Sequence, residues 1–586
     1  MAIRLGRSSR IFEDPSDGKP IPSLTASSLR AERLWNMLPL ALSLFLITCL
    51  AWGPFAAPQV LAAGLVLFLG YWLVRTYAVV AACVVGLRRI RNWERTNWIA
   101  KYCEWLPGHP EAEAWDWPRH VVIIPNYKES EEGLSRTLDS LAVQANAGQL
   151  VVVMAMEARE MGCRAKADLL LKKYRARFGE MFATYHPAGL PGEAPGKGSN
   201  EAWAAREAHI RLIEDGGDDI RRYSVTSCDA DAVFHAHHFE ALNHLFLTAR
   251  DRYRTFWQPT IFNTNNLWDI PAPLRMMDGL SGINRLSNLV LPGSLKFPTS
   301  CYSVSWEMLT EVDYWDEEVI PEDWHIFLKC CFTLGDRVHV EPIFLPLGND
   351  CVLTESYWKT MKAHYAQSVR HAWGASDIPY AWRACRNGRT PLSRRRRFAL
   401  TGAVTKVHSL WAAQWYLITL GSRIPALLQA HTGAQMPGWW LARAFRLPAP
   451  SWNIGAMLGG DFSNPVTPWV NLSIDDMLIS LCLFALIGLI TIELKIRGPR
   501  PDYVSRKAFV GQFFIWPAMA FITFFWASLP ALHAQWKLAS GQGLIYRVAE
   551  KGSRKFAMPA AASHATSLSE MAPEGEYGTA AGGGGA

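Results

Sequence analysis

Residues 121–154 of the 586-residue chain are VVIIPNYKESEEGLSRTLDSLAVQANAGQLVVVM. Val121–Ile124 and Leu150–Met154 are continuous apolar runs of a length typical of strands buried on both faces. Between them, Glu131–Ala145 carries leucines at every third or fourth position, which gives a helix one apolar face. The stretch therefore predicts a strand–helix–strand unit, a mostly parallel sheet, and ligands at the carboxyl ends of its strands.

The alternation of short apolar and polar stretches continues over residues 93–397, and no run within it is long enough to cross a membrane. This pattern predicts one α/β domain of about 300 residues. Pro187–Gly198 is rich in Pro and Gly and is expected to form a loop. Ser199–Ile213 is expected to be a helix with Ser199 as its N-cap.

Long apolar runs lie on both sides of this domain. Residues 34–87 hold two runs that can each cross a hydrocarbon core of roughly 30 Å, so they predict a transmembrane hairpin. Arg75 lies inside the second run and needs water or a partner there; a functional role and simple packing are both open. Residues 398–532 are expected to form transmembrane and interfacial helices, with spans at 398–420, 472–494 and 509–532 and an open number between 421 and 468.

Clusters of arginine set the predicted topology. Four arginines follow the hairpin between residues 88 and 95, and Arg394–Arg397 precede the next span, so the positive-inside rule places the α/β domain in the cytoplasm. Residues 1–33 are then a cytoplasmic lead-in, and residues 553–586, rich in Ala, Ser and Gly, a disordered tail. We expect an integral, multi-pass protein, most simply of a bacterial inner membrane.

The composition supports a membrane protein and argues against two other classes. Half of the residues are hydrophobic, 26 are Trp, and the net charge of +7 is concentrated in arginine clusters that suit membrane lipids better than nucleic acid. The eleven cysteines show no Cys-x-x-Cys pair and no zinc-finger spacing. We therefore expect no nucleic-acid partner, no structural zinc and no disulfide framework.

A pair of aspartates follows another strand-like run. Ser224–Ser227 leads into Cys228-Asp229-Ala230-Asp231. Carboxylates at i and i+2 on an extended chain point the same way, so both can face one divalent cation and the diphosphate it carries. The alternative is two solvated loop aspartates.

Two further stretches have the composition of a nucleotide site. The first strand ends in Pro125-Asn126-Tyr127-Lys128-Glu129, where Pro125 directs the loop, Tyr127 offers a ring, and Glu129 can accept from a base N–H. Gly196-Lys197-Gly198-Ser199-Asn200 leads into a helix, and Gly, the helix N-terminus and the Lys197 charge all favour phosphate. The spacing differs from that of a Walker A motif.

Two later stretches complete the polar set. Glu322-Asp323 stands at the head of an apolar helix, whose dipole would help to keep Asp323 ionised as a base, although a simple cap is the alternative. Gln367, Arg370 and His371 share one helix face, near Trp373, and this face can hold a diphosphate or be a solvated surface.

The order Pro-x-Tyr-x-Glu, Gly-Lys-x-x-Asn, Asp-x-Asp, Glu-Asp and Gln-x-x-Arg between membrane hairpins resembles the membrane-integrated family-2 glycosyltransferases. These include cellulose synthase and hyaluronan synthase, and ceramide glucosyltransferase has a similar core. PNYKESEEGLSRTLDSLAVQ, residues 125–144, is similar to the opening of the cellulose-synthase type. The resemblance covers residues 118–375 with all its motifs, and it implies a GT-A-type, Rossmann-like catalytic domain.

The resemblance also implies a role for each motif. Tyr127 and Glu129 would line the nucleobase pocket, and Lys197 would lie near the nucleotide. Asp229 and Asp231 would hold the nucleotide and a Mg²⁺ or Mn²⁺ ion. Asp323, next to Glu322, would be the general base. Gln367 and Arg370 would contact the diphosphate or shape the acceptor mouth.

Three positions depart from the family's pattern. Glu157 stands after the second strand, where the family usually has an Asp that contacts the base. His371 replaces a Trp that stacks on the acceptor sugar in polymerising members, and Trp373 follows two residues later. Three histidines follow Asp231, and they would either complete the metal shell or be surface residues: His235, His237 and His238.

Together these features predict an inverting, metal-dependent glycosyltransferase that uses a nucleotide-sugar, with a UDP-sugar favoured. The acceptor would be held at the membrane: a lipid such as diacylglycerol, ceramide or polyprenyl phosphate, or the end of a growing polysaccharide. His371 favours a lipid or short product over a processive synthase. A transporter or sensor that only binds nucleotide-sugar is the alternative of another class. The sugar, the nucleobase and any protein partner stay open.

Overall fold

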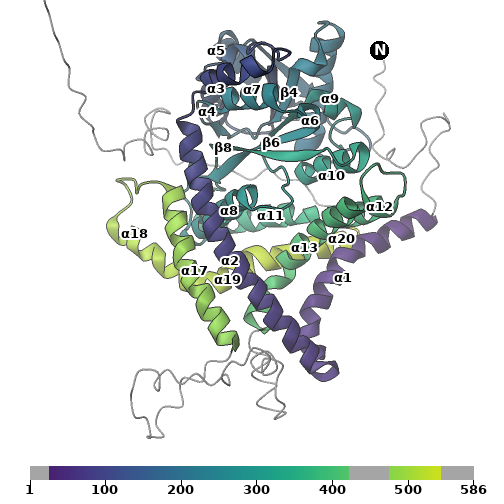
Figure 1. Ribbon diagram of the computed structural model, residues 1–586, viewed down its shortest axis with the longest axis vertical. Helices are drawn as coiled ribbons and strands as arrows, with labels where there is room; N and C mark the ends of the chain where they lie inside the picture. Colours follow the sequence, from purple (N-terminus) through teal and green to yellow (C-terminus); the bar gives the residue numbers. More distant parts are fainter. Residues whose placement is uncertain (1–25, 422–473, 543–586) are drawn as a thin grey trace, which may run out of the picture.

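The structure, a computed structural model, describes residues 26–421 and 474–542 (Figure 1). Most of the predicted lead-in, nearly all of residues 421–468, where the number of spans is open, and the predicted tail 553–586 lie outside the described residues. Figure 1 shows an α/β domain at one end of the molecule and long helices, among them α1, α2 and α17, extending from it.

The domain is built on an eight-stranded sheet with the order β3-β2-β1-β4-β7-β6-β8-β5. β7 and β5 run antiparallel to their neighbours, and the other six strands run the same way, so the fold is Rossmann-like with a mostly parallel sheet, as predicted. The strands are β1 (Arg119–Asn126), β2 (Leu150–Glu157), β3 (Glu180–His186), β4 (Tyr223–Ser227), β5 (Val233–Phe234), β6 (Thr255–Asn263), β7 (Tyr302–Ser305) and β8 (His339–Asn349).

The first strand pairs in parallel with β2 on one side and β4 on the other. All four residues of Val121–Ile124 are fully buried, and alternate side chains enter two different hydrophobic cores, one on each face of the sheet. The prediction of a strand buried on both faces is confirmed. The apolar run of β2 is likewise buried along its whole length.

Helices cover both faces of the sheet. One face carries α3 (Trp98–Trp105), α4 (Glu131–Ala142), α5 (Cys163–Tyr174) and α7 (His238–Thr248). The other carries α6 (Lys197–His209), α9 (Trp306–Glu311), α10 (Glu322–Leu334) and α12 (Asp377–Arg386). Two further helices, α8 (Ala272–Val290) and α11 (Tyr357–Ala372), connect this domain to the flanking helices.

Two predicted helices occur with different ends. α4 begins as expected, because the Ser130 side chain accepts from the Gly133 N–H, but it stops at Ala142. α6 begins at Lys197, so the prediction that Ser199 is the N-cap is wrong. The Ser199 hydroxyl instead donates to the carbonyls of Ala194 and Gly196 inside the first turn. The Gly/Pro loop therefore ends two residues earlier than its composition suggested.

Three helical stretches in the described part of the chain are long and apolar enough to cross a membrane: Glu32–Ala56 within α1 (Ala26–Ala56), α2 (Pro58–Glu94), and Arg506–Ala539. The first two match the predicted hairpin. The third contains α18 (Arg506–Gly511), α19 (Met519–Thr523) and α20 (Leu529–Ala539), separated by a 3₁₀ turn with Pro517 and a π turn.

The other two predicted spans are helices that are not among these candidates. α13 (Arg394–Thr419) covers the span expected at 398–420, but its four arginines, Lys406 and several hydroxyl side chains lower its hydropathy. α17 (Ile474–Arg497) covers the span expected at 472–494, and its first side chains lie outside the described residues.

The direction of the strands brings five separate segments to one edge of the sheet. The loops after β1 and β4 lie at the carboxyl edge because these strands are parallel. β7 is antiparallel to β4, and Tyr302 pairs with Ser227, so the segment that enters β7 lies at the same edge. Contacts described below add the beginnings of α6 and α10 to this group.

A buried charge cluster fixes α10 to its surroundings. The imidazole of His325 hydrogen-bonds to Asp316 at 2.9 Å and to Asp377, the first residue of α12, at 2.7 Å. Burial alone would lower the pKa of His325, but the two carboxylates outweigh it and raise this pKa to about 9. His325 is therefore an imidazolium ion at neutral pH, and it ties α10 to α12.

This cluster predicts a pH-dependent contribution to stability. The pKa of His325 is raised on folding from about 6.5, its value in the unfolded chain, to about 9. The contribution of His325 to the free energy of unfolding is therefore complete below pH 6.5 and is lost as the pH rises through about 9. We expect His325→Gln to lower the Tm of the purified protein at pH 6.5 and to have a much smaller effect near pH 10. A difference in Tm that stays the same across this range would contradict the assignment.

Candidate active site

Lys197 lies at the centre of a group of acidic side chains from three elements. Its Nζ is 3.0 Å from Asp229 Oδ1, 3.3 Å from Glu322 Oε1, and 3.8 Å from both Asp323 Oδ1 and Glu201 Oε1. Burial alone would lower the pKa of Lys197, but the four carboxylates raise it well above its usual value. The ammonium group is therefore charged, and it holds the starts of α6 and α10 beside the loop after β4.

Gly198 makes this arrangement sterically possible. A Cβ built at this position would lie 3.1 Å from the Cβ of Glu322. The missing side chain lets the first turn of α6 approach the first turn of α10. Gly198 is therefore needed for the close packing of α6 against α10.

Ser300 joins the same acidic groups through its backbone and its side chain. Its N–H donates to Asp323 Oδ2 at 2.7 Å, and its carbonyl accepts from Lys197 Nζ at 2.5 Å. Its hydroxyl donates to Asp229 Oδ2 and accepts from Asn349 Nδ2, the latter at 2.8 Å. Its φ of +61° lies in the left-handed region, where a non-glycine residue costs about 1 kcal/mol or more.

Sequence alone did not identify Ser300. It lies in Phe297-Pro298-Thr299-Ser300-Cys301, a stretch without a carboxylate, a lysine or a glycine. Its partners lie 71 and 23 positions away along the chain. Ser300 lies at this edge of the sheet because it directly precedes β7, which runs antiparallel to β4.

The two carboxylate oxygens of Asp323 have different surroundings. Its Oδ2 accepts from Ser300 N, whereas its Oδ1 is buried without a hydrogen-bond partner among the described residues. Burial, and then the charge of Glu322, raise the pKa of Asp323 well above its ordinary range, against the effects of Lys197 and the Ser300 amide. The same surroundings raise the pKa of Glu201 to about 7, with burial as the main cause.

The two aspartates of the Asp-x-Asp pair have different partners. The chain turns here, because the Ala232 N–H donates to the Asp229 carbonyl, so the extended-chain argument for their common direction is wrong. Asp229 faces Lys197 and Ser300, as described above. Asp231 is buried, and its Oδ2 accepts from the Asp350 N–H at 2.6 Å.

Asp229 and Asp231 do not belong to a protein-only metal site in the described part of the chain. Within the described residues, no group of three or more His, Cys, Asp or Glu side chains has the arrangement of a protein-only metal site. Mg²⁺ often takes only one or two carboxylates and completes its shell with water and substrate phosphates. Asp229 and Asp231 are the two carboxylates that the sequence predicts for such a site. Three nearby histidines do not extend the pair to a larger group among the described residues: His235, His237 and His238.

The residues expected near a nucleobase also lie together. Tyr127 lies under the guanidinium of Arg159, 4.2 Å from its ring centre, and Arg159 pairs with Glu157 at 3.0 Å. Pro125 pairs with Ala155 of β2 in the strand that leads to this loop. One carboxylate oxygen of Glu129 accepts from the Tyr127 N–H at 2.6 Å, so Glu129 also closes the loop itself.

The predicted polar residues of α11 do not all lie close to the Asp229 group. His371 is exposed on this helix, and the charges of Arg370 and Asp229 both act on its imidazole ring. Gln367 and Arg370 lie on the same helix and are half-buried. Trp373 instead packs into the apolar contact that α11 makes with α13 and α20.

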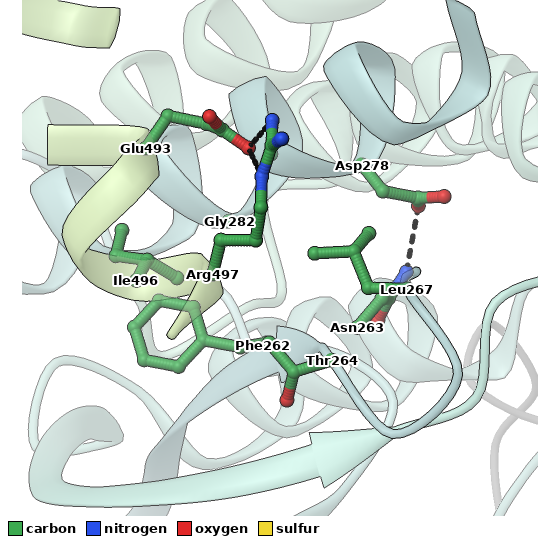
Figure 2. A pocket seen from close by; sticks show the side chains of 10 residues that line it. Phe262, Asn263, Thr264, Leu267, Asp278, Gly282, Glu493, Ile496 and Arg497 are labelled. Atoms are coloured by element: carbon green, nitrogen blue, oxygen red, sulfur yellow. Dashed lines mark hydrogen bonds and ion pairs between the residues drawn. The ribbon is translucent and has the colours of Figure 1, made fainter. Parts of the chain in front are cut away.

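A small pocket lies where α17 meets α8 and the end of β6, and Figure 2 shows its lining. Glu493 and Arg497 of α17 form an ion pair there, and Asn263 donates to Asp278 of α8 at 2.8 Å. Gly279 leaves room for Glu493, since a Cβ at this position would lie 2.6 Å from Glu493 Cγ. This pocket is a packing junction between a flanking helix and the domain.

One family model matches part of this chain. Residues 224–487 match the family model described as "Glycosyl transferase family group 2". The match begins at β4 and includes Asp229, Asp323 and Arg370. This part of the chain is therefore similar to the family-2 glycosyltransferases.

Among solved structures, the chain is similar to the mannosyltransferase PcManGT from Pyrobaculum calidifontis in complex with GDP-Man and Mn²⁺. The two sequences are 15% identical, and the match covers 73% of this chain and 99% of that one with a TM-score of 0.35. No curated protein sequence matches this chain.

The role of the Ser300 hydroxyl can be tested with two variants. Ser300→Gly keeps both backbone contacts and relieves the left-handed strain, whereas Ser300→Ala keeps the strain; both remove the bond to Asp229. We expect both to lower the rate of nucleoside diphosphate release by about tenfold, because a hydrogen bond to a charged group is lost. Wild-type rates in both variants would show that Ser300 acts only through its backbone.

Proposed function

We propose that the protein is an inverting, metal-dependent glycosyltransferase that moves a sugar from a nucleotide-sugar to an acceptor held at the membrane. The observation that carries the proposal is the joint contact of Asp229 and Asp323 with Lys197 and Ser300. Donor-binding and base motifs that are about ninety residues apart in sequence thus lie within one hydrogen-bonded group. A UDP-sugar donor and a lipid acceptor are favoured.

The donor side would be formed by the loops after β1, β2 and β4. Tyr127, with Arg159 and Glu157, offers a ring and charged hydrogen-bonding groups for a nucleobase. Asp229 and Asp231 would hold a Mg²⁺ or Mn²⁺ ion, which would neutralise charge on the leaving diphosphate. Lys197 lies beside Asp229 and supplies a second, permanent positive charge at this place.

The acceptor side would be formed by the start of α10. Asp323 Oδ1 would take the proton from an acceptor hydroxyl while that oxygen bonds to the anomeric carbon of the sugar. The bond from this carbon to the diphosphate breaks on the opposite side, so a single displacement inverts the configuration. The Ser300 N–H holds the other carboxylate oxygen and fixes the direction of Oδ1.

Asp323→Asn tests this assignment, because asparagine still accepts from Ser300 N but cannot take a proton. We expect transfer from a nucleotide-sugar to membrane lipid to fall at least about 100-fold, with little change in donor affinity. Asp313→Asn is the matched control, since Asp313 is exposed and pairs only with Arg206 among its described salt bridges. Normal turnover by Asp323→Asn would show that another group is the base.

Metal removal tests the donor side. We expect EDTA to abolish the release of nucleoside diphosphate by the wild-type protein, and Mg²⁺ or Mn²⁺ to restore it. Asp229→Ala should stay inactive at any concentration of added metal. No release from any common nucleotide-sugar would favour a transporter or sensor, and release that ignores EDTA would contradict the metal site.

A further inference from the structure

Lys166 is a charged residue on the buried face of α5. Its neighbours on this face are Cys163, Ala167 and Leu170, which pack into one of the two cores of the domain. A lysine at such a position is rare unless it is paired, because the burial of an ammonium group is unfavourable. A methionine or leucine would fill the same space without this penalty. Packing alone therefore does not account for a lysine here.

The three N–H donors of the Lys166 ammonium group all have partners, which lie at the ends of two neighbouring strands. One donor bonds to Asn126 Oδ1 at 3.1 Å, at the end of β1, and one to the Glu129 carbonyl at 2.9 Å, in the loop that follows. The third bonds to Glu160 Oε1, in the loop after β2, with which Lys166 forms an ion pair. Lys166 therefore joins the loop after β1 to the loop after β2.

Glu160 makes a second link between these two loops. Its other carboxylate oxygen, Oε2, accepts from the Lys128 N–H at 2.7 Å. The φ of Lys128 is +67°, in the left-handed region that a non-glycine residue seldom adopts, so this conformation needs support from its surroundings. Only 9% of the Lys166 side chain and 12% of the Glu160 side chain are exposed, so solvent and salt screen the ion pair little.

The ion pair holds the backbone on both sides of Tyr127. It binds the side chain of Asn126, which precedes Tyr127, and the main chain of Lys128 and Glu129, which follow it. Arg159, whose guanidinium lies 4.2 Å from the centre of the Tyr127 ring, directly precedes the acidic member of the pair. The same contacts therefore set the position of the Tyr127 ring relative to Arg159.

We propose that Glu160 and Lys166 are positioning residues for the nucleotide, which hold the loops after β1 and β2 in the shape that receives the nucleobase. This rests on the proposed function, in which Tyr127 lines the nucleobase pocket. Both residues act through Tyr127 and its neighbours, not by contact with the donor. A loop that is already held in its binding shape loses less conformational entropy when the nucleotide binds. The pair therefore raises donor affinity and leaves the chemical step unchanged.

The proposal is tested by nucleotide binding to the full-length protein in detergent, measured by isothermal titration with Mn²⁺ present. UDP and pyrophosphate are the two probes, because only UDP carries a nucleobase; GDP takes the place of UDP if the wild-type protein binds GDP more tightly. We expect Lys166→Met and Glu160→Ala each to weaken nucleotide binding about tenfold and to change pyrophosphate binding less than twofold. Lys172→Met removes an exposed lysine from the same helix and should match the wild type for both probes.

The kinetic constants provide a second readout. In Lys166→Met and Glu160→Ala, the KM for the nucleotide-sugar should rise about tenfold, whereas kcat should stay within about twofold of the wild-type value. Equal losses of nucleotide and pyrophosphate affinity, or a fall in kcat without a rise in KM, would overturn the proposal, because the pair would then act on the whole site. Wild-type nucleotide affinity in both variants would overturn it as well.

A double variant separates positioning from stability. Each single variant leaves one buried charge without its partner, which lowers stability by itself. In Lys166→Met/Glu160→Gln both charges are gone, methionine fills the space of the lysine, and glutamine can still accept from the Lys128 N–H. We expect its Tm to be close to that of the wild type while nucleotide binding stays about tenfold weaker. Wild-type nucleotide affinity in the double variant would show that the single variants act only through the unpaired charge.

Nucleotide binding is read without any transfer reaction, so the two proposals can fail separately. A preparation that transfers no sugar but binds a nucleotide in a Lys166-dependent manner would contradict the enzymatic function alone. Transfer with a wild-type KM in the Lys166→Met variant would contradict the positioning role alone. A wild-type protein that binds none of UDP, GDP and ADP would contradict both.

Discussion

The contact of the Lys197 ammonium group with four carboxylates is the interaction on which the site depends. Asp229, Glu201, Glu322 and Asp323 come from three elements, and without a cation their mutual repulsion would separate these elements. One lysine does not balance four acids, and burial raises the pKa of three of them. These three carboxyl groups can therefore exchange protons at a higher pH than ordinary carboxyl groups, and the net negative charge of the site favours the binding of a further cation.

The surrounding fold holds this group from several sides. Gly198 allows α6 to approach α10, and the left-handed Ser300 sets one hydrogen bond on Asp229 and another on Asp323. On the far side of α10, His325 ties the same helix to α12. The proposed base and the proposed donor residues thus lie on elements whose relative positions are fixed by buried charges, which suits a reaction that requires accurate placement.

Part of the fold and of the candidate site could be predicted from sequence, because the features that determine it lie close together along the chain. The apolar runs of β1 and β2, the face of α4 and the order of the polar motifs are all visible along the chain, and they lead to the correct sheet. Ser300 and Asn349 were not predictable, because only the antiparallel β7 and the β6–β8 pairing bring them to Asp229. The geometry of Asp229 and Asp231 was mistaken because a turn replaces the assumed extended chain.

The most direct test of the account is the pH dependence of kcat in two variants that change the charge next to Asp323. Its raised pKa places the acid limb of the wild-type profile above the range of an ordinary aspartate, about pH 4. Removing the positive charge in Lys197→Gln should move this limb to higher pH, and removing the negative charge in Glu322→Gln should move it to lower pH. Limbs at the same pH in all three proteins would contradict the central claim that this charge group controls the base.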